Sequence, residues 1–252
     1  MKNLTICGLN LDINWTNKGL NLRKIEEYFD IEKADIFLLP EMFSTGFNMN
    51  AKEIADREEE TLLWMKDFAK NKGSAVCGSV SIEENNQFFN RFYFVKPDGE
   101  YDYYDKRHLF SYSAEDEIYS AGKEKVIVHY KGWNILLQVC YDLRFPVFSR
   151  NTGDYDVAFY VANWPEKRID AWNILLKARA IENQSYVFGL NRIGKDGNEI
   201  TYPKSSYCFF ADGSQVSTEQ ENWVKAELDC EKLTLFRNQF QFLKDGDSFQ
   251  IT

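Results

Sequence analysis

The fold is indicated most clearly by one stretch of the sequence, QVCYDLRFP at residues 138–146. It continues an apolar run that begins at Trp133 and is typical of a strand buried on both faces. Cys140 comes at the end of this predicted strand, and Pro146 favours a turn or the first turn of a helix soon after it. A cysteine in this place is presented at the rim of a sheet, where backbone N–H groups face it. That geometry suits attack on a carbonyl carbon, although most free cysteines are simply small buried hydrophobic residues.

The composition of the chain indicates a globular protein with a large core. It has 252 residues, of which 44% are hydrophobic, and this suits one large domain or two small ones. No linker, low-complexity segment or block of charge divides the chain, so we expect one domain over residues 1–252. The net charge of −9 argues against non-specific binding to nucleic acid. No apolar stretch approaches the roughly 18 residues of a membrane span, so we expect no membrane partner.

The cysteines and the N-terminal segment bear on the cellular compartment. The five cysteines include no CxxC pair, and an odd number cannot pair completely within one chain, which favours a reducing cytoplasm. Residues 1–9 are too short and too polar for a signal peptide, and we expect them to form the first strand. The chain has only two histidines, which excludes a histidine-rich metal site.

The hydrophobic pattern predicts strands and helices without a visible sequence repeat. Apolar runs of strand length occur at residues 4–9, 35–39, 74–82, 90–95, 100–104, 126–130, 133–139, 156–162, 186–190, 205–210 and 220–228. Helical spacing of apolar residues occurs at 20–29, 53–71 and 169–183. This order predicts an α/β fold in which two packed sheets carry helices on the outside. The aromatic C-terminal segment, 236–252, is a candidate for packing across a partner subunit.

Two charged residues also follow predicted strands. Glu41 comes soon after the apolar run 35–39, and Lys106 follows the strand at 100–104. Ligands of α/β proteins gather beyond the carboxyl ends of strands, so both are candidates for chemistry, although each alone is more often a surface residue. A glutamate can accept the proton of a thiol whose pKa is about 8.5, and a lysine can stabilise a negatively charged product. Glu41, Lys106 and Cys140 together therefore suit acyl transfer.

Three local motifs resemble the nitrilase (carbon–nitrogen hydrolase) superfamily and occur in the order found there. They are LLPEMF at 38–43, YDKRHLF at 104–110 and VCYDLRFP at 139–146. The resemblance extends over essentially the whole chain and includes ANWP at 162–165 and LLKARAIENQ at 175–184. Within the superfamily the chain looks most like the ω-amidase branch, whose members hydrolyse the terminal amide of 2-oxoglutaramate or 2-oxosuccinamate. The residues after the cysteine and the Asn-Trp-Pro before the long helix suggest this branch.

The resemblance implies a fold, an assembly and a set of roles. The fold is a four-layer αββα sandwich, the assembly is a homo-oligomer that is often a dimer, and no metal or organic cofactor is used. Glu41 would be the general base that deprotonates Cys140, which attacks the amide carbon and forms a thioester. Lys106 and the backbone N–H of Tyr141 would form the oxyanion hole, and water would then hydrolyse the thioester with Glu41 again as base.

The superfamily also has a second glutamate after the lysine, which assists positioning. The resemblance places it best at Glu115, because of the spacing between this residue and Gly122. Glu117 is the alternative.

Substrate recognition is expected to involve Arg144, four residues after the cysteine. A guanidinium there can bind a carboxylate through two hydrogen bonds, which would suit a short amide with an acid at its far end. The alternative is an arginine paired with Asp142 or another structural carboxylate. Tyr141, which adjoins the cysteine, is also expected to bind substrate. Three further aromatic residues are candidates for pocket walls that would equally suit the core: Phe43, Phe47 and Trp164.

Other functions are compatible with parts of the sequence. A Cys-His protease or transferase would use His108 or His129 as its base, but the contexts of Glu41 and Lys106 would then go unexplained. A binding protein could keep the same fold without chemistry. Within the superfamily, an aliphatic amidase or an N-carbamoyl amine hydrolase is the main alternative.

Overall fold

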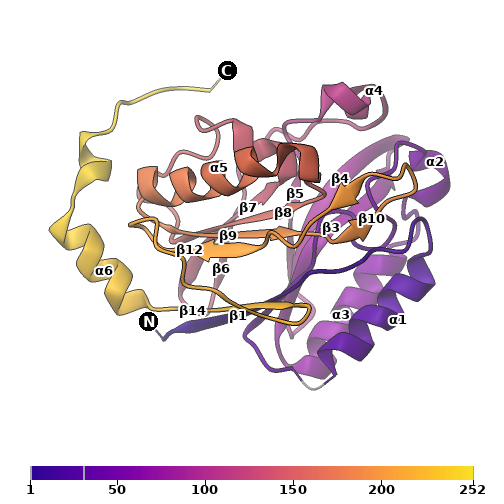
Figure 1. Ribbon diagram of the computed structural model, residues 1–252, viewed down its shortest axis with the longest axis horizontal. Helices are drawn as coiled ribbons and strands as arrows, with labels where there is room; N and C mark the ends of the chain where they lie inside the picture. The colour runs from indigo at the N-terminus through magenta and orange to yellow at the C-terminus, as the bar shows by residue number, and fades with distance from the viewer. Residues whose placement is uncertain (1, 31, 252) are drawn as a thin grey trace.

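Two β-sheets lie face to face in the computed structural model, which describes residues 2–30 and 32–251 (Figure 1). The first sheet has the order β13-β14-β1-β2-β3-β4-β5, and the second has the order β12-β9-β8-β7-β6. The strands of the first sheet are β1 (Leu4–Leu9), β2 (Ile36–Leu38), β3 (Ala75–Glu84), β4 (Gln87–Val95), β5 (Tyr101–Asp105), β13 (Thr218–Gln220) and β14 (Trp223–Leu228). Those of the second are β6 (Ile127–Tyr130), β7 (Trp133–Val139), β8 (Val157–Ala162), β9 (Tyr186–Asn191) and β12 (Tyr207–Phe209).

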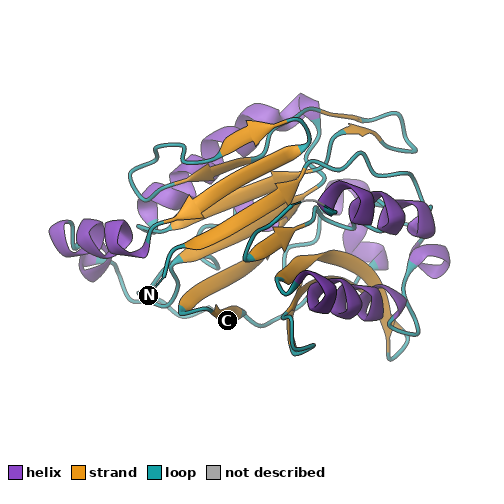
Figure 2. Cartoon of the chain, turned by 90° about the horizontal axis from the view of Figure 1, so that it is seen from below, coloured by secondary structure: helices purple, strands orange, loops and turns teal. Residues whose placement is uncertain are grey.

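Helices cover the outer face of each sheet (Figure 2). The long helices are α1 (Lys18–Phe29), α3 (Glu60–Lys72) and α5 (Ile169–Glu182), and the shorter ones are α2 (Ala51–Ile54), α4 (Glu115–Ile118) and α6 (Cys230–Gln239). A small hairpin of β10 (Gly194–Lys195) and β11 (Thr201–Tyr202) stands apart from both sheets. None of the helices within residues 2–30 and 32–251 is both long and apolar enough to cross a membrane.

Three hydrophobic clusters separate these layers. The largest lies between the sheets and contains Leu38, three residues before Glu41, and Val139, which directly precedes Cys140. A second joins the first sheet to α1 and α3, and a third joins the second sheet to α5 through Trp172 and Leu176. Close approach of α5 requires Gly189 on β9, because a Cβ there would lie 2.3 Å from Leu176 Cδ1. The expected αββα sandwich is confirmed.

Strand direction brings the expected site residues to one end of the molecule. β1, β2 and β3 are parallel, and β5 runs the same way because it is antiparallel to β4, which is antiparallel to β3. β7, β8 and β9 are also parallel to one another. The two sheets meet at their carboxyl ends, where the N–H of Asn163 after β8 donates to Glu41 Oε2 at 2.8 Å.

Two of the helical regions differ from the sequence prediction, and the four-residue helix α4 was not expected either. The helix expected at 53–71 is divided, because the buried Asp56 accepts the N–H of Thr61 at 2.7 Å and pairs with Lys18. The Asp56 side chain anchors the start of α3, while its backbone forms a β-bridge with Ile82, so the division of the helix depends on tertiary contacts. Helix α6 was not expected, although Asp229 caps it by accepting the N–H of Lys232.

Candidate active site

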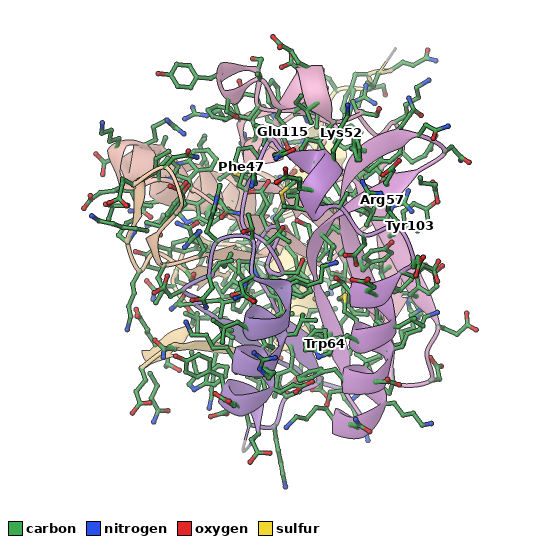
Figure 3. All side chains as sticks on the ribbon, turned by 90° about the vertical axis from the view of Figure 1, so that its right-hand side faces the viewer. Phe47, Lys52, Arg57, Trp64, Tyr103 and Glu115 are labelled. Atoms are coloured by element: carbon green, nitrogen blue, oxygen red, sulfur yellow. The ribbon has the colours of Figure 1, made fainter. Side chains whose placement is uncertain are left out.

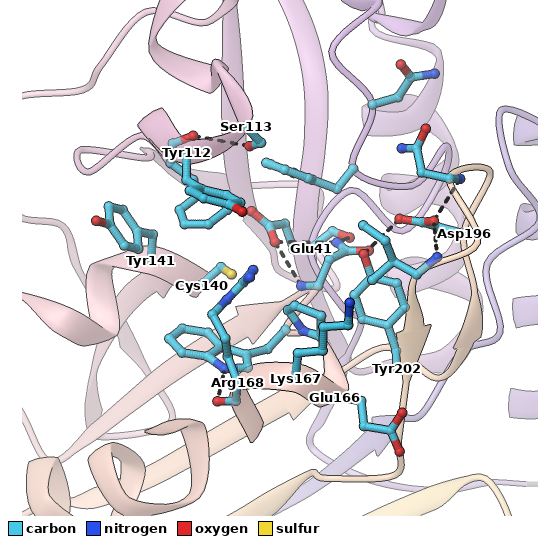
Figure 4. Close-up of a pocket in the computed structure, with 18 of the residues that line it drawn as sticks. Glu41, Tyr112, Ser113, Cys140, Tyr141, Glu166, Lys167, Arg168, Asp196 and Tyr202 are labelled. Atoms are coloured by element: carbon cyan, nitrogen blue, oxygen red, sulfur yellow. Dashed lines mark hydrogen bonds between the residues drawn. The ribbon is translucent and has the colours of Figure 1, made fainter. Parts of the chain in front are cut away.

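Cys140 begins a 3₁₀ turn, Cys140–Arg144, immediately after β7. Its backbone has a φ of +44°, in the left-handed region that residues other than glycine rarely occupy. Such strain is maintained only where the surrounding structure enforces it, and it is concentrated at functional sites. Here the strain turns a partly buried side chain out of the sheet and into a pocket of about 720 Å³ (Figure 4).

Lys106 lies between two carboxylates at the inner end of this pocket. Its Nζ is 2.9 Å from Glu41 Oε1, and 3.0 and 2.9 Å from the two oxygens of Glu115. All three side chains are fully buried. Burial of charged groups is costly unless each is paired and hydrogen-bonded, and here each is. The structure therefore brings together the lysine and both glutamates that the sequence singled out.

Two asparagines complete this cluster. The side-chain N–H of Asn90, on β4, donates to Glu41 Oε1 at 2.8 Å and to Glu115 Oε1 at 3.2 Å. Asn163 donates its backbone N–H to Glu41 Oε2 at 2.8 Å and its amide N–H to the Glu41 carbonyl at 2.7 Å. Sequence reasoning missed both roles. Asn163 stands just beyond a predicted strand, which is a usable signal, whereas Asn90 lies inside a strand and gives none.

Glu115, rather than Glu117, is the second glutamate of the cluster. Glu115 is fully buried, and its Oε2 also accepts the N–H of Phe110 at 2.6 Å. Glu117 is exposed. Ala114, just before Glu115, has a φ of +58°, which is a second point of backbone strain beside the cluster.

The pocket shifts the pKa of three of its groups. Burial raises the pKa of the Cys140 thiol well above its usual value, and the charge of Glu41 adds to this effect. Burial would lower the pKa of Lys106, but the carboxylates of Glu115 and Glu41 outweigh it and raise that pKa. Burial raises the pKa of Glu115, while Lys106 opposes the rise. At neutral pH the resting site therefore holds a neutral thiol beside a charged ammonium.

The residues expected to bind substrate are divided between the pocket and the core. Tyr141, Arg144, Trp164 and Phe47 line the pocket. Phe43 does not, and its expected place in the pocket wall is corrected. It is buried against the helices of the first sheet, with its ring centroid 6.0 Å from that of Trp64 on α3. Figure 3 shows Phe47 close to Glu115 and Trp64 well away from both.

Arg144 is exposed and does not pair with Asp142. Its guanidinium lies 5.0 Å from the ring centroid of Trp164. Sequence reasoning missed two neighbouring cations, Lys167 and Arg168, which also line the pocket and point toward its middle (Figure 4). The guanidinium of Arg168 lies 5.0 Å from the ring centroid of Phe110. Within the described residues none of these three cations forms an ion pair, so the outer wall of the pocket carries uncompensated positive charge.

Three acidic residues of the outer wall compensate that charge only in part, because Glu166 is exposed and forms no ion pair among the described residues and the other two are held in a hairpin. Asp196 is held within the β10–β11 hairpin, where it accepts the N–H groups of Asn198 and Ile200 and the hydroxyl of Tyr202. Glu199 pairs with Lys195 at 3.1 Å. No pattern in the sequence indicated that this hairpin would border the pocket.

Neither histidine lines the pocket among the described residues. The ring of His108 faces Asp142, with Nδ1 2.7 Å from Oδ1, and His129 on β6 faces Asn134. A cysteine–histidine mechanism therefore has no support in the geometry. A thiol beside a carboxylate and an ammonium can instead form and hydrolyse a thioester without histidine.

Comparisons with known proteins agree with this geometry. The family model for carbon-nitrogen hydrolases matches residues 3–238. The chain is 44% identical to the omega-amidase YafV of Yersinia enterocolitica, with 100% of both chains covered. It is 33% identical to the 2-oxoglutaramate amidase of Bacillus subtilis, with 96% of each covered.

The fold matches that of a crystal structure from the same family. XC1258 of Xanthomonas campestris is a CN-hydrolase superfamily protein with an arsenic adduct in its active site, and the superposition covers 100% of both chains with a TM-score of 0.97 and 38% identity. The resemblance expected from the three motifs is therefore confirmed, and the chain belongs to the carbon-nitrogen hydrolase family.

Proposed function

We propose that this protein hydrolyses the terminal amide of a small 2-oxo acid, of the 2-oxoglutaramate or 2-oxosuccinamate type, to a carboxylic acid and ammonia. One observation carries the proposal. A buried Glu41–Lys106–Glu115 cluster beside Cys140 opens into a pocket whose outer wall holds unpaired arginines. The names of the omega-amidase and 2-oxoglutaramate amidase relatives support the same substrate class.

The first half of the proposed reaction releases ammonia. The Cys140 thiol transfers its proton to Glu41 as the sulfur attacks the amide carbon, because burial leaves little thiolate beforehand. The carbonyl oxygen becomes an oxyanion, which Lys106 and the backbone N–H of Tyr141 stabilise. As the C–N bond breaks, Glu41 passes the proton to the departing nitrogen, and ammonia leaves a thioester on Cys140.

The second half restores the enzyme. Water loses a proton to Glu41 and attacks the thioester carbon, again forming an oxyanion at Lys106. Collapse breaks the C–S bond, the carboxylic acid leaves, and the proton on Glu41 returns to the sulfur. Asn90 and Asn163 keep Glu41 in place through both halves, and Glu115 keeps Lys106 in place. These steps use only side chains, a backbone N–H and water.

The outer cations are proposed to select an acidic substrate. Arg144 can hold the far carboxylate through two hydrogen bonds, and Arg168 can donate to its remaining oxygen or to the 2-oxo group. Trp164 contacts and positions both arginines, because its ring lies beneath Arg144 and its Nε1–H donates to the Arg168 carbonyl at 2.7 Å.

We also propose that the protein is a cytoplasmic homodimer. Helix α5 supports the dimer because its outer face exposes Ile174 and Ile181, which are 67% and 47% accessible. Light scattering on the purified protein, and on an Ile174→Glu variant, tests this: the wild type should have twice the mass of the chain, and the variant should dissociate.

Ammonia release by the purified protein tests the proposed activity. The panel contains 2-oxoglutaramate, 2-oxosuccinamate, glutamine, a simple aliphatic amide, an N-carbamoyl amine and a nitrile. Preference for the two 2-oxo amides is the expected result. Preference for the aliphatic amide or the carbamoyl amine would keep the Cys140 chemistry but overturn the substrate class. No release from any member, with Cys140 still open to alkylation, would favour a binding protein with this fold.

A further inference from the structure

Asp142 is a buried carboxylate that the proposed reaction does not use. It is the third residue of the Cys140–Arg144 turn and is fully buried. Its Oδ2 accepts the N–H of Val139 at 2.9 Å and the hydroxyl of Tyr104 at 2.8 Å. Its Oδ1 accepts the N–H of His108 at 3.1 Å and lies 2.7 Å from His108 Nδ1. Four contacts therefore converge on one side chain.

These contacts join the two segments that carry the reacting groups. Tyr104 and His108 stand two residues before and two residues after Lys106, while Val139 directly precedes Cys140. Tyr141, whose N–H is proposed to bind the oxyanion, lies between Cys140 and Asp142. A shift of Asp142 relative to His108 would therefore change the distance between the Lys106 ammonium and the Tyr141 N–H.

The His108 side chain is built to hold this carboxylate. An ionised carboxylate only accepts hydrogen bonds, so Nδ1 of His108 must carry a proton in either charge state of the ring. The ring stacks on Phe145, which follows the same turn, with centroids 3.9 Å apart and planes 7° from parallel. Across the described residues, His108 is the basic side chain that contacts Asp142.

We propose that Asp142 and His108 are positioning residues that fix the nucleophile turn to the lysine segment and so align the two halves of the oxyanion site. This rests on the proposed function of Cys140, Lys106 and the Tyr141 N–H. Neither side chain touches the substrate, so its loss acts on the transition state more than on substrate binding, which lowers kcat with little change in KM.

Two substitutions of His108 distinguish the effect of its hydrogen bond to Asp142 from the effect of its ring packing on Phe145. His108→Phe keeps a ring to stack on Phe145 but loses the donor, whereas His108→Asn loses the ring but keeps an N–H near the place of Nδ1. We expect His108→Phe to lower kcat for ammonia release about 30-fold to 100-fold, the cost of a misaligned catalytic group, with KM within about twofold. We expect His108→Asn to retain kcat within about threefold. His129→Phe, which changes an exposed histidine outside the pocket, is the matched control and should leave kcat unchanged.

A packing role for His108 predicts the reverse order, with His108→Asn the more damaged variant, and that result would overturn the proposal. Equal loss in both variants, or full activity of His108→Phe, would also overturn it. If His108→Phe does not fold, as judged by circular dichroism, Tyr104→Phe removes a different donor to Asp142 and should lower kcat in the same selective way. Unchanged kcat in Tyr104→Phe would then count against the proposal.

Acetylation of Cys140 by p-nitrophenyl acetate separates this proposal from the substrate assignment. Formation of the acetyl-enzyme needs the thiol and the oxyanion donors but no recognition of an amide, and the released nitrophenolate is measured directly. If the wild type is acetylated but hydrolyses no amide in the panel, the substrate proposal fails. Faster acetylation of His108→Asn than of His108→Phe would still support the positioning role of Asp142 and His108. A wild type that undergoes neither reaction would overturn both.

Discussion

The inner and outer ends of the pocket are built in opposite ways. At the inner end, Glu41, Lys106 and Glu115 are fully buried, and every charge has a partner of opposite sign. At the outer end, Arg144 and Arg168 rest on aromatic rings, reach solvent and form no ion pair within the described residues. The inner end is held by ion pairs within the protein, whereas the outer end has cations without a paired carboxylate among the residues that the structure describes.

The difference indicates which region performs chemistry and which selects the substrate. A buried ion cluster seldom stabilises a fold more than an apolar core would, so its presence needs another explanation, and catalysis provides one. Exposed guanidinium groups cost the fold little and are free to bind an anion. Substitutions at the inner end should therefore lower kcat on every amide, whereas those at the outer end should change KM on acidic amides alone.

The largest effect is expected from removing the nucleophile. Cys140→Ala should lower ammonia release by at least about 10⁴-fold on every amide, because the remaining groups cannot form the thioester. Circular dichroism should show an intact fold, and Cys230→Ser, which changes a cysteine outside the pocket, is the control. Activity near the wild-type level in Cys140→Ala would contradict the proposed mechanism.

The protonation state of the inner end gives the second prediction. Because burial raises the pKa of Cys140, the thiol stays protonated at pH values where a free thiol would already ionise. The rate of alkylation by iodoacetamide should follow the thiolate fraction and rise about tenfold per pH unit, or about 100-fold from pH 7 to pH 9. A rate that levels off near pH 7 would instead indicate a thiolate formed in advance.

The sequence predicted part of the inner end from strand geometry, whereas Glu115 was placed only by the resemblance to the superfamily. Apolar runs predict the strands, and the carboxyl ends of strands that run the same way meet at one edge, so the approach of Glu41, Lys106 and Cys140 follows from their positions along the chain. The αββα layers and the family follow from the same motifs. The roles of the individual side chains stay predictions until the variants are measured.

What the sequence did not predict depends on contacts between distant segments. Phe43 follows Glu41 by two residues, yet Met42 adopts a φ of +46° and the chain turns Phe43 away from the pocket. Asn90 lies within β4, where nothing in the local pattern distinguishes it from a structural polar residue. Arg168 precedes α5, and its position at the pocket depends on contacts with distant residues, because its carbonyl accepts the Trp164 Nε1–H and its guanidinium lies over Phe110.

The third prediction concerns the second carboxylate of the inner end. Glu115→Gln should lower kcat about 10-fold to 100-fold on all amides, because Lys106 loses a charged partner and its ammonium is less well placed. Glu117→Gln makes the same chemical change at an exposed position and should have no effect. Equal activity of both variants would show that Glu115 has no role in the reaction.

At the outer end, Arg144→Ala should raise KM for 2-oxoglutaramate about tenfold and leave neutral amides unaffected, as expected for the loss of one charge-assisted contact. Arg144→Lys keeps the charge but loses the planar fork, so it should fall between the wild type and Arg144→Ala. A rise in KM of equal size on neutral amides would show that Arg144 shapes the pocket rather than binding a carboxylate.

The smallest effect is expected at Trp164, where the two ends meet. Trp164→Phe keeps a ring beneath Arg144 but removes the N–H that donates to the Arg168 carbonyl, so KM for acidic amides should rise about threefold, the effect of one lost hydrogen bond. Trp64→Phe is the matched control, because its Nε1–H donates at 2.7 Å to Glu26 on α1, and neither residue lines the pocket. Trp164 also follows Asn163, which holds Glu41. A fall in kcat rather than a rise in KM would therefore mean that the segment acts mainly on the inner end, and that the division between chemistry and selection is less complete than the charges suggest.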